Sequence, residues 1–279
     1  MVAQDPLPAY TRARLGQVRG FLFDMDGTLY VGARAMEGAV ELMAAIRASG
    51  LPCLVLTNNS SKSRTIYRDR LAGLGMEVAL DQVLTSGEAS AQWLAHHTTL
   101  RRPFVLGTEA LAEACERAGL TPAPYDDADS VLLGYDTSLT YAKLADACLL
   151  VARGLPYYAT HADRTCIDPR GLLPDAGGLI AAVEVTTGKR PILLGKPEKS
   201  MCDAGLKRLG TTARETLMLG DQLDTDMTLG VRHGLVAVLT LTGEVSATQA
   251  AASDVRPDVV VPHPGVLLGY LRAEGVLPS

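Results

Sequence analysis

Cysteine is scarce in this sequence, and its scatter excludes several kinds of site. The five occurrences are Cys53, Cys115, Cys148, Cys166 and Cys202. The number is odd, and no pair has the close spacing of a zinc site or a redox motif. Because most of them lie in apolar segments, we expect buried thiols and a reducing compartment, the cytoplasm.

Long apolar runs and an excess of positive charge are also missing. No apolar stretch approaches the roughly 20 residues of a membrane span, and MVAQDPLPAYTRARLGQ lacks the continuous apolar region of a signal peptide. The formal net charge is −5, from 26 Lys and Arg against 31 Asp and Glu. Nucleic acids and anionic membranes attract concentrated Lys and Arg, so we expect neither as a partner.

The glycine-rich phosphate loops G-x-x-x-x-G-K-[ST] and G-x-G-x-x-G do not occur, which argues against the common nucleotide-binding classes. What is present is the composition of a globular chain. It has 279 residues, of which 47% are hydrophobic and 20% charged. That length suffices for one large domain or two ordinary ones.

Short apolar runs alternate with stretches whose apolar residues recur at helical spacing. GFLF precedes the helical pattern EGAVELMAAIRASG, which we expect to stop at Gly50, and PCLVLTNNS precedes KSRTIYRDRLAGLG. Further strand patterns are PFVLG, SVLLGYD, PYYATH, PILLGK, TLMLGD, LVAVLTL and DVVV. This alternation predicts an α/β fold, a Rossmann-like and mainly parallel sheet with helices on both faces.

Polar side chains follow four of these strand patterns. They are Asp24 and Asp26 after FLF, Thr57 and Asn58 after LVL, Lys196 after PILLG, and Asp221 after TLMLG. Ligands of open parallel sheets bind outside the carboxyl ends of the strands. If the four strands are neighbours, these side chains converge on one crevice.

Such a cluster is suited to phosphoryl transfer. Carboxylate, hydroxyl and amide oxygens are the ligands that Mg²⁺ prefers. Acids alone would repel a phosphate dianion, by about 1 kcal/mol for two unit charges 4 Å apart in water and several times more near a protein surface. A divalent ion and a lysine reverse that sign, and a carboxylate nucleophile then permits an aspartyl-phosphate route.

Each of the four segments has a structural interpretation when it is taken alone. D-x-D-G is common in turns, and TNNS can cap the following helix. GKP can be an ordinary turn, and GDQLDTD can be a loop with a helix cap. Their occurrence together, at four strand ends and in this order, favours the catalytic interpretation.

These segments resemble a known family. DMDGTLY (24–30), TNNS (57–60), GKP (195–197) and GDQLDTD (220–226) are similar, in order and character, to the four motifs of the haloacid-dehalogenase-like superfamily (HAD). TNN narrows the resemblance to the NagD-type, p-nitrophenylphosphatase-like branch, and it runs from about Gly20 to Val261. It implies a phosphatase that uses Mg²⁺, with Mn²⁺ as a substitute, on a sugar phosphate, nucleotide or similar small phosphomonoester through an aspartyl phosphate.

The resemblance also implies a role for each motif residue. Asp24 matches the nucleophile, and Asp26 the general acid that protonates the leaving oxygen and later activates water. Lys196 matches the lysine that neutralises the nucleophile and phosphate. The other matches are Asp24, the Asp26 carbonyl and Asp221 as metal ligands, Asp226 as a supporting acid, and Thr57, Asn58, Asn59 and Lys196 as phosphate ligands. Asp224 is expected to be solvated or to start a helix.

The spacing of the motifs locates a second domain. The 30 residues between Asp26 and Thr57 leave room for one turn and one helix. About 140 residues separate Asn58 from Lys196, far more than one crossover helix needs. We therefore expect a core of residues 1–83 and 191–279 with an inserted, smaller α/β domain of residues 84–190. The family's corresponding insert is a cap that excludes water and selects the substrate.

Three segments of this insert resemble family segments near the substrate. GYD (134–136) and ATHAD (159–163) contribute Asp136 and His161 as expected cap contacts, although the family more often has TNPD where this chain has THAD. The structural alternatives are a helix cap near Thr140 for Asp136 and an ordinary surface position for His161. DAGGLIAAVE (175–184) resembles the return to the core, where its glycines permit a helix start near the leaving group or a tight turn.

Other functions stay open on the sequence alone. A phospho-receiver module also uses acids, Thr and Lys on a parallel sheet, but receivers are shorter and usually lack an acid at the position of Asp26. A phosphotransferase or phosphomutase on the same fold is a second alternative, because fold does not determine reaction. A catalytically inactive binding protein is disfavoured by the intact motifs. The substrate is not predicted, and a homodimer through an exposed cap edge is left open.

Overall fold

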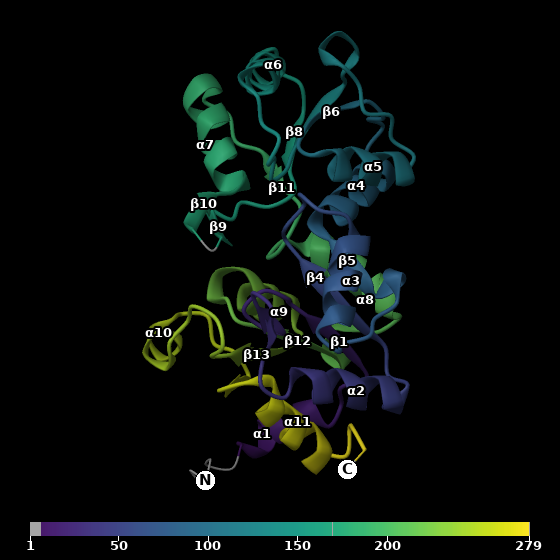
Figure 1. The fold of residues 1–279 in the computed structure, drawn as a ribbon, viewed down its shortest axis with the longest axis vertical. Coiled ribbons are helices and arrows are strands. Elements are labelled where there is room, and N and C mark those ends of the chain that lie inside the picture. Colours follow the sequence, from purple (N-terminus) through teal and green to yellow (C-terminus); the bar gives the residue numbers. More distant parts are fainter. Residues whose placement is uncertain (1–6, 169, 279) are drawn as a thin grey trace. The chain divides into compact units, whose positions relative to one another are not determined.

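The computed structural model describes residues 7–168 and 170–278, which form two compact units (Figure 1). The first unit contains the described parts of Met1–Leu56, Arg68–Val83 and Cys202–Ser279, and the second contains those of Thr57–Tyr67 and Leu84–Met201. The predicted insert, residues 84–190, falls within the second unit. That unit also takes the TNNS and GKP segments, which the predicted ranges placed in the core.

A six-stranded sheet in the order β14-β13-β12-β1-β4-β5 organises the first unit. The strands are β1 (Gly20–Phe23), β4 (Cys53–Thr57), β5 (Val83–Thr85), β12 (Thr216–Gly220), β13 (Val236–Thr240) and β14 (Val259–Val261), with the last residues of β4 and β5 assigned to the second unit. β1 pairs in parallel with β12 and β4, and β13 pairs in parallel with β12 and β14. β1, β12 and β13 are buried along their whole length, as strands covered on both faces are. The predicted parallel α/β core is confirmed.

Helices connect these strands. They are α1 (Ala9–Leu15), α2 (Ala39–Ser49), α9 (Thr228–His233), α10 (Ala247–Ala252) and α11 (Pro264–Ala273), together with α3 (Arg64–Gly73) and α8 (Lys199–Leu209), which the division between the units cuts. α2 ends as predicted at Gly50, whose φ of 73° is the left-handed C-terminal conformation that glycine favours. A short hairpin, β2 (Tyr30–Val31) and β3 (Arg34–Ala35), follows the first motif.

The second unit has its own parallel sheet, in the order β11-β8-β7-β6. Its strands are β6 (Pro103–Leu106), β7 (Ser130–Leu133), β8 (Tyr157–Ala159) and β11 (Ile192–Leu193), and its helices are α4 (Ser86–His97), α5 (Glu109–Arg117), α6 (Tyr141–Ala152) and α7 (Ala176–Thr187). An antiparallel hairpin, β9 (Thr165–Asp168) and β10 (Gly171–Pro174), precedes α7.

Both faces of this second sheet are covered, because successive side chains of a strand point to opposite faces. Val131 and Leu133 of β7 pack in a cluster with residues of α6 and α7. Leu132, between them, packs with residues of α4 and α5. The insert is therefore an α/β layer structure of its own.

One predicted strand belongs to a different sheet than expected. The pattern PILLGK forms β11, which pairs with β8 at the edge of the second sheet. Of the four strands with polar residues at their ends, β12, β1 and β4 are neighbours in the first sheet, and β11 is not part of it. An apolar run predicts a strand but carries no information about its partner.

All five cysteines are thiols, as predicted, and four are buried, with Cys166 partly exposed. Burial raises the pKa of Cys53 to about 11, and burial is also the main cause that raises the pKa of Cys115 to about 12.

Because the thiolate is the reactive form, we expect iodoacetamide at pH 8 to modify Cys166 first and Cys53 and Cys115 last. Peptide mapping of timed samples measures the order, and guanidinium should abolish it. Equal rates in the folded protein would contradict it.

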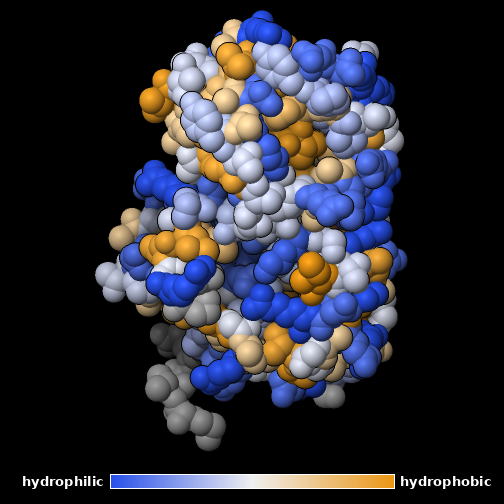
Figure 2. Space-filling model, turned by 45° about the horizontal axis from the view of Figure 1, so that its top comes forward, coloured by the Kyte–Doolittle hydropathy of each residue, from blue (hydrophilic) through white to orange (hydrophobic). Residues whose placement is uncertain are grey.

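Hydrophobic residues are dispersed among hydrophilic ones on the face drawn in Figure 2. Tyr141 and Val185, on α6 and α7, are among the large hydrophobic side chains that are exposed. Within the described residues, no helix combines the length and the apolar character that crossing a bilayer demands.

Candidate functional site

The turn after β1 brings the first motif close to an acid from another strand. The carbonyl of Met25 accepts a hydrogen bond of 2.8 Å from the amide of Leu29. Gly27 has a φ of 86°, and a Cβ at this position would lie 2.3 Å from Asp221 Oδ2. The glycine of DMDG is therefore required both for its left-handed backbone and for this close approach.

Three carboxylates meet at the ends of β1 and β12. Ligand oxygens of Asp24, Asp221 and Asp226 all lie within 4.8 Å of one another. Asp221 is 2% and Asp226 1% exposed. Thr28 Oγ1 donates a hydrogen bond of 3.0 Å to Asp221 Oδ1. Thr28 belongs to the first motif and Asp221 to the last, so this hydrogen bond joins the two motifs directly.

The backbone around this acidic group leaves no room for a further methyl group. A Cβ at Gly243 would lie 1.8 Å from Asp221 Oδ2, and one at Gly220 would lie 2.2 Å from the Cβ of Asp226. Gly220 belongs to a predicted motif. Gly243 lies in the loop after β13 and was not predicted, because an isolated glycine in TLTGE carries no distinguishing local signal.

The acidic group has the chemistry of a divalent cation site. Three carboxylates this close repel one another, and burial strengthens the repulsion because the surroundings are less polarisable than water. A hard cation with oxygen ligands removes that repulsion. Asp24 and Asp221 were predicted as metal ligands, and Asp226, which was predicted as a supporting acid, lies in the same group. The expected ligation by the Asp26 carbonyl stays a prediction.

The side chain of Asp26 is not part of the acidic group of Asp24, Asp221 and Asp226, and it contacts Tyr30 and Arg70 instead. Tyr30 Oη donates a hydrogen bond of 3.2 Å to Asp26 Oδ2. Arg70 Nη1 lies 3.9 Å from Asp26 Oδ1, and the side chain of Asp26 remains 59% exposed. The carboxyl of Asp26 is thus exposed and lies two residues from Asp24. Arg70 was not predicted, since it lies 44 residues further along the chain.

In the second unit, the side-chain amide of Asn58 holds the backbone of Lys196. Asn58 Oδ1 accepts a hydrogen bond of 2.9 Å from the amide of Lys196, and Asn58 Nδ2 donates at 3.1 Å to the Lys196 carbonyl. Nδ2 also donates at 3.1 Å to Asp163 Oδ1. Both amide hydrogens of Asn58 are therefore engaged, and its side chain positions the lysine segment.

Lys196 is buried, and the partly buried Asp163 is close enough for their charges to interact. Lys196 is 4% exposed. Burial raises the pKa of Asp163, while His161, Lys196 and the hydrogen bond from Asn58 act in the opposite direction. Sequence reasoning named ATHAD as a segment but not its aspartate. Asn58, Asp163 and Lys196, which are distant in the chain, are thus linked within the second unit.

The other predicted phosphate ligands are arranged around the turn after β4. The hydroxyl of Thr57 accepts a hydrogen bond of 3.1 Å from the amide of Asn59. Asn59 Oδ1 in turn accepts from the amide and hydroxyl of Ser61 at 2.9 and 2.7 Å. The side chain of Asn59 therefore stabilises the turn, and the phosphate-binding roles of these residues stay predictions.

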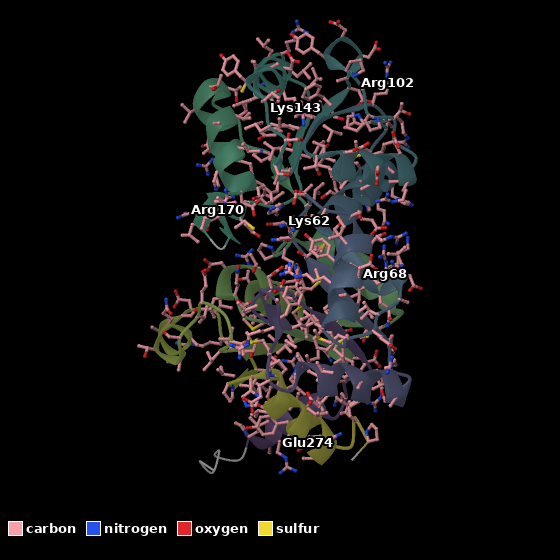
Figure 3. All side chains as sticks on the ribbon, in the orientation of Figure 1. Lys62, Arg68, Arg102, Lys143, Arg170 and Glu274 are labelled. Atoms are coloured by element: carbon pink, nitrogen blue, oxygen red, sulfur yellow. The ribbon has the colours of Figure 1, made fainter. Side chains whose placement is uncertain are left out.

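The first expected cap contact, Asp136, is enclosed by partners of its own unit. Its side chain is 0% exposed and pairs with Lys143 Nζ at 2.6 Å; Figure 3 labels Lys143 on α6. Asp136 Oδ1 accepts from the amide and hydroxyl of Ser138, at 2.8 and 2.7 Å. The cap of α6 is Thr140, whose side chain accepts from the amide of Lys143. These contacts favour a structural role for Asp136.

His161, the second expected cap contact, is buried, so it is not an ordinary surface histidine. It is 1% exposed. Its Nδ1 lies 2.8 Å from the Thr160 hydroxyl, and its Nε2 lies 2.9 Å from Asp175 Oδ1. Asp175 also accepts from the first amide of α7, so the helix starts at the predicted glycine segment. Both ring nitrogens are thus engaged within the unit.

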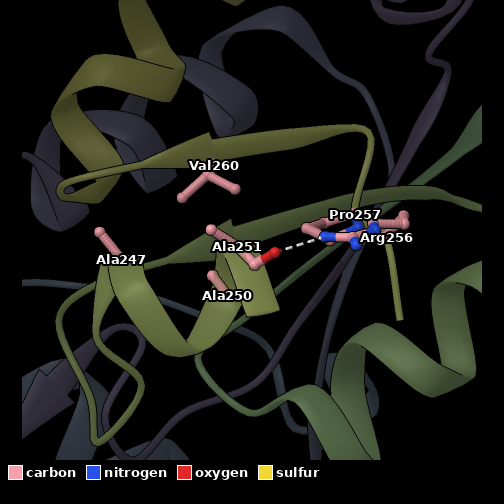
Figure 4. A pocket seen from close by; sticks show the side chains of 6 residues that line it. All are labelled: Ala247, Ala250, Ala251, Arg256, Pro257 and Val260. Carbon is pink, nitrogen blue, oxygen red and sulfur yellow. Dashed lines mark hydrogen bonds between the residues drawn. The ribbon is translucent and has the colours of Figure 1, made fainter. Parts of the chain in front are cut away.

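A pocket of about 370 Å³ lies in the first unit beside α10 (Figure 4). Its walls are apolar apart from Arg256, whose Nη1 donates a hydrogen bond of 2.8 Å to the Ala251 carbonyl. None of the predicted site residues lines it. It therefore offers no support for a phosphate site.

The family is shown by sequence comparison. A family model described as haloacid dehalogenase-like hydrolase matches residues 21–121, and a second, described as HAD-hydrolase-like, matches residues 193–264. The chain belongs to the haloacid dehalogenase-like family of hydrolases. The predicted NagD-type, p-nitrophenylphosphatase-like branch is confirmed by solved structures and curated relatives.

Among solved structures, 4-nitrophenylphosphatase from Thermotoga maritima superposes with a TM-score of 0.87 and 35% identity, over 92% of this chain and 98% of its own. NagD from Escherichia coli K-12 gives 0.84 and 30%, over 89% and 97%. Among curated proteins, 5′-nucleotidase YutF of Bacillus subtilis is 36% identical over 81% of this chain and 88% of its own. An acid sugar phosphatase of Staphylococcus haemolyticus is 31% identical over 86% and 91%. The chain is an enzyme of the phosphatase type.

Proposed function

We propose that this enzyme hydrolyses a small phosphomonoester by a Mg²⁺-dependent route through a phosphorylated Asp24. The observation that carries the proposal is the acidic group, in which a carboxylate at the end of the central strand lies beside two buried acids. Relatives named 5′-nucleotidase and acid sugar phosphatase support a nucleotide or a sugar phosphate as the substrate class. The thiol state of the cysteines supports a reducing, cytoplasmic compartment.

The first half-reaction transfers the phosphoryl group to the enzyme. A carboxylate oxygen of Asp24 attacks phosphorus, and the bond between phosphorus and the ester oxygen breaks. Asp26 gives its proton to that oxygen, so the alcohol leaves neutral. Asp26 is exposed and lies two residues from the nucleophile, which supports this role.

The second half-reaction restores the enzyme. Asp26, now ionised, accepts a proton from water, whose oxygen attacks phosphorus. The bond between phosphorus and Asp24 breaks, inorganic phosphate leaves, and Asp26 is again protonated. Lys196 contributes positive charge to the phosphoryl group, and the turn from Thr57 to Asn59 supplies hydrogen-bond donors.

Asp24 and Asp221, with the Asp26 carbonyl and the nearby Asp226, would hold the Mg²⁺. The ion supplies positive charge that offsets the repulsion between the acids and a phosphate dianion. The oxygen donor set favours Mg²⁺ or Mn²⁺ over zinc.

The test is a phosphate-release assay over nucleotides, sugar phosphates and other phosphomonoesters, with Mg²⁺ present. We expect release of one phosphate per alcohol formed, abolished by excess chelator and restored by Mg²⁺ or Mn²⁺. Ca²⁺ takes more ligands at longer distances and should bind and inhibit. Full activity in chelator would contradict the metal site, and phosphate appearing on an acceptor alcohol instead of in solution would support a phosphotransferase.

The close packing at Gly243 yields a sharper test of the metal site. The Gly243→Ala variant should displace the carboxylate of Asp221, because its Cβ would lie 1.8 Å from Oδ2. We expect Mg²⁺ affinity to fall by roughly 10–100-fold, the range for groups that orient a metal ligand. Isothermal titration of Mg²⁺ and the Mg²⁺ dependence of kcat measure it.

Gly269 offers a matched control for this substitution. It lies within α11, and a Cβ there would meet nothing within 4 Å. Gly269→Ala should leave Mg²⁺ affinity unchanged and raise stability by about 1 kcal/mol or less, the helix-propensity gain. Unchanged Mg²⁺ affinity in both variants would contradict the assignment of Asp221 as a metal ligand.

A further inference from the structure

Two side chains without an assigned role contact the carboxyl of Asp26. Tyr30 Oη lies 3.2 Å from Oδ2, and Arg70 Nη1 lies 3.9 Å from Oδ1. The two carboxyl oxygens thus have different partners. Because more than half of the Asp26 side chain is exposed, packing does little to restrict its rotamer, and these polar contacts determine where its oxygens lie.

Tyr30 is a fixed point in this arrangement. It is 0% exposed, so its ring cannot change rotamer without opening the core. Its backbone carbonyl accepts a hydrogen bond of 2.9 Å from the amide of Gly27, and its backbone bridges to that of Asp26. The phenol hydroxyl is therefore held relative to the same turn that carries Asp24 and Asp26.

Arg70 is held by the ring of Tyr30 and by the turn of the β2–β3 hairpin. Its guanidinium carbon lies 4.3 Å from the centroid of the Tyr30 ring, a cation–π contact. Its Nη2 donates a hydrogen bond of 2.9 Å to the carbonyl of Gly32, in the turn between β2 and β3. A planar guanidinium with these two supports keeps Nη1 close to the carboxyl of Asp26.

We propose that Tyr30 and Arg70 are positioning residues that hold the carboxyl of Asp26 for both of its proton transfers. The proposal rests on the proposed function, in which Asp26 is the general acid and then the general base. A phenol hydroxyl can donate to a carboxylate and accept from a carboxylic acid, so the Tyr30 contact persists in both half-reactions. Arg70 offers its positive charge to the ionised form, which activates water in the second.

The competing explanation is that these contacts only stabilise the β2–β3 hairpin. The cation–π contact and the bond to Gly32 would serve that purpose without Asp26. The two explanations differ in the substrates that each variant affects. A displaced general acid harms substrates whose alcohol needs a proton to leave, whereas a loosened hairpin harms all substrates alike.

The experiment measures kcat/KM for an alkyl phosphate, glycerol phosphate or the best alkyl ester of the panel, and for p-nitrophenyl phosphate. This constant reports the steps up to departure of the alcohol. We expect Tyr30→Phe and Arg70→Gln to lower it about tenfold for the alkyl ester, a part of the 10²–10⁴ that general acid–base catalysis contributes. The kcat/KM for p-nitrophenyl phosphate should fall less, because its phenolate leaves without a proton.

Two further variants sharpen the result. Arg70→Lys keeps the positive charge but loses the planar guanidinium that stacks on Tyr30, so it should recover only part of the loss caused by Arg70→Gln. Arg68→Gln changes an arginine of the same helix, labelled in Figure 3, that pairs with Asp69 at the surface. It should leave both constants unchanged.

A double-variant cycle tests whether Tyr30 acts through Asp26. In an Asp26→Ala background, assayed by kcat with p-nitrophenyl phosphate, adding Tyr30→Phe should cause no further loss. A further loss there, or an equal fall for both substrates in the single variants, would overturn the proposal. If Asp26→Ala itself shows no preference between the substrates, the proposed role of Asp26 fails and the inference with it. If Asp26→Ala shows that preference and the Tyr30 and Arg70 variants do not, the inference alone fails.

Discussion

The Asp24→Asn variant should lose turnover by roughly 10⁴-fold or more, the scale seen when a member of a catalytic unit is removed. The amide has nearly the same shape as the carboxylate but lacks its nucleophilic charge. It also removes one of three mutually repelling acids, so we expect an unchanged or higher melting temperature. Steady-state assays with p-nitrophenyl phosphate and thermal denaturation measure the two effects.

An exposed acid of the last motif gives the matched control for Asp24. Asp224 is exposed, as predicted, and lies outside the acidic group. Asp224→Asn should keep normal kcat. Trapping with a fluoroberyllate phosphate mimic should place it on Asp24, and full activity of Asp24→Asn, or a mimic bound elsewhere, would contradict the assignment of the nucleophile.

Lys196→Met should lower kcat by about 10²–10³, the loss typical of removing one preorganised charge-stabilising group. Methionine keeps the length of the side chain and removes its charge. The backbone contacts with Asn58 do not depend on the lysine side chain, and burial already favours the neutral form of the neighbouring Asp163 by raising its pKa, so the melting temperature should change little. The measurement is kcat for p-nitrophenyl phosphate beside a melting curve.

Lys143→Met should show the opposite pattern. Lys143 pairs with the fully buried carboxylate of Asp136, and removing it leaves that charge with less compensation. We expect a lower melting temperature and nearly normal kcat for p-nitrophenyl phosphate. If Lys196→Met gave this pattern instead, the lysine would be a structural residue.

Much of the fold follows from local sequence patterns. Strands buried on both faces must be apolar along their length, and β1, β12 and β13 are. Helix ends have local chemistry, so the stop at Gly50 was predictable. The pattern PILLGK also predicted a strand correctly, but its pairing with β8 depends on residues more than 30 positions away.

The two expected cap contacts, Asp136 and His161, stay predictions. Asp136 and His161 were chosen as polar residues at strand ends, but the structure surrounds them with Lys143 and Asp175. Whether a polar side chain faces a ligand or a buried partner depends on which helix packs above it. Neither GYD nor ATHAD encodes that packing.

Local sequence patterns are sufficient to predict which polar groups stand at the carboxyl ends of strands, because strand periodicity and motif order are local properties of the chain. Which of these groups meet depends on how the chain folds. Folding brings Asp226 to Asp24 and Asp221, Gly243 against Asp221, and Arg70 to Asp26. Asp24 lies more than 190 positions from Asp221 and Asp226, Arg70 lies 44 positions from Asp26, and Gly243 lies 22 positions from Asp221. These contacts depend on strand order and close backbone packing, which a glycine or an arginine in a one-dimensional pattern cannot reveal.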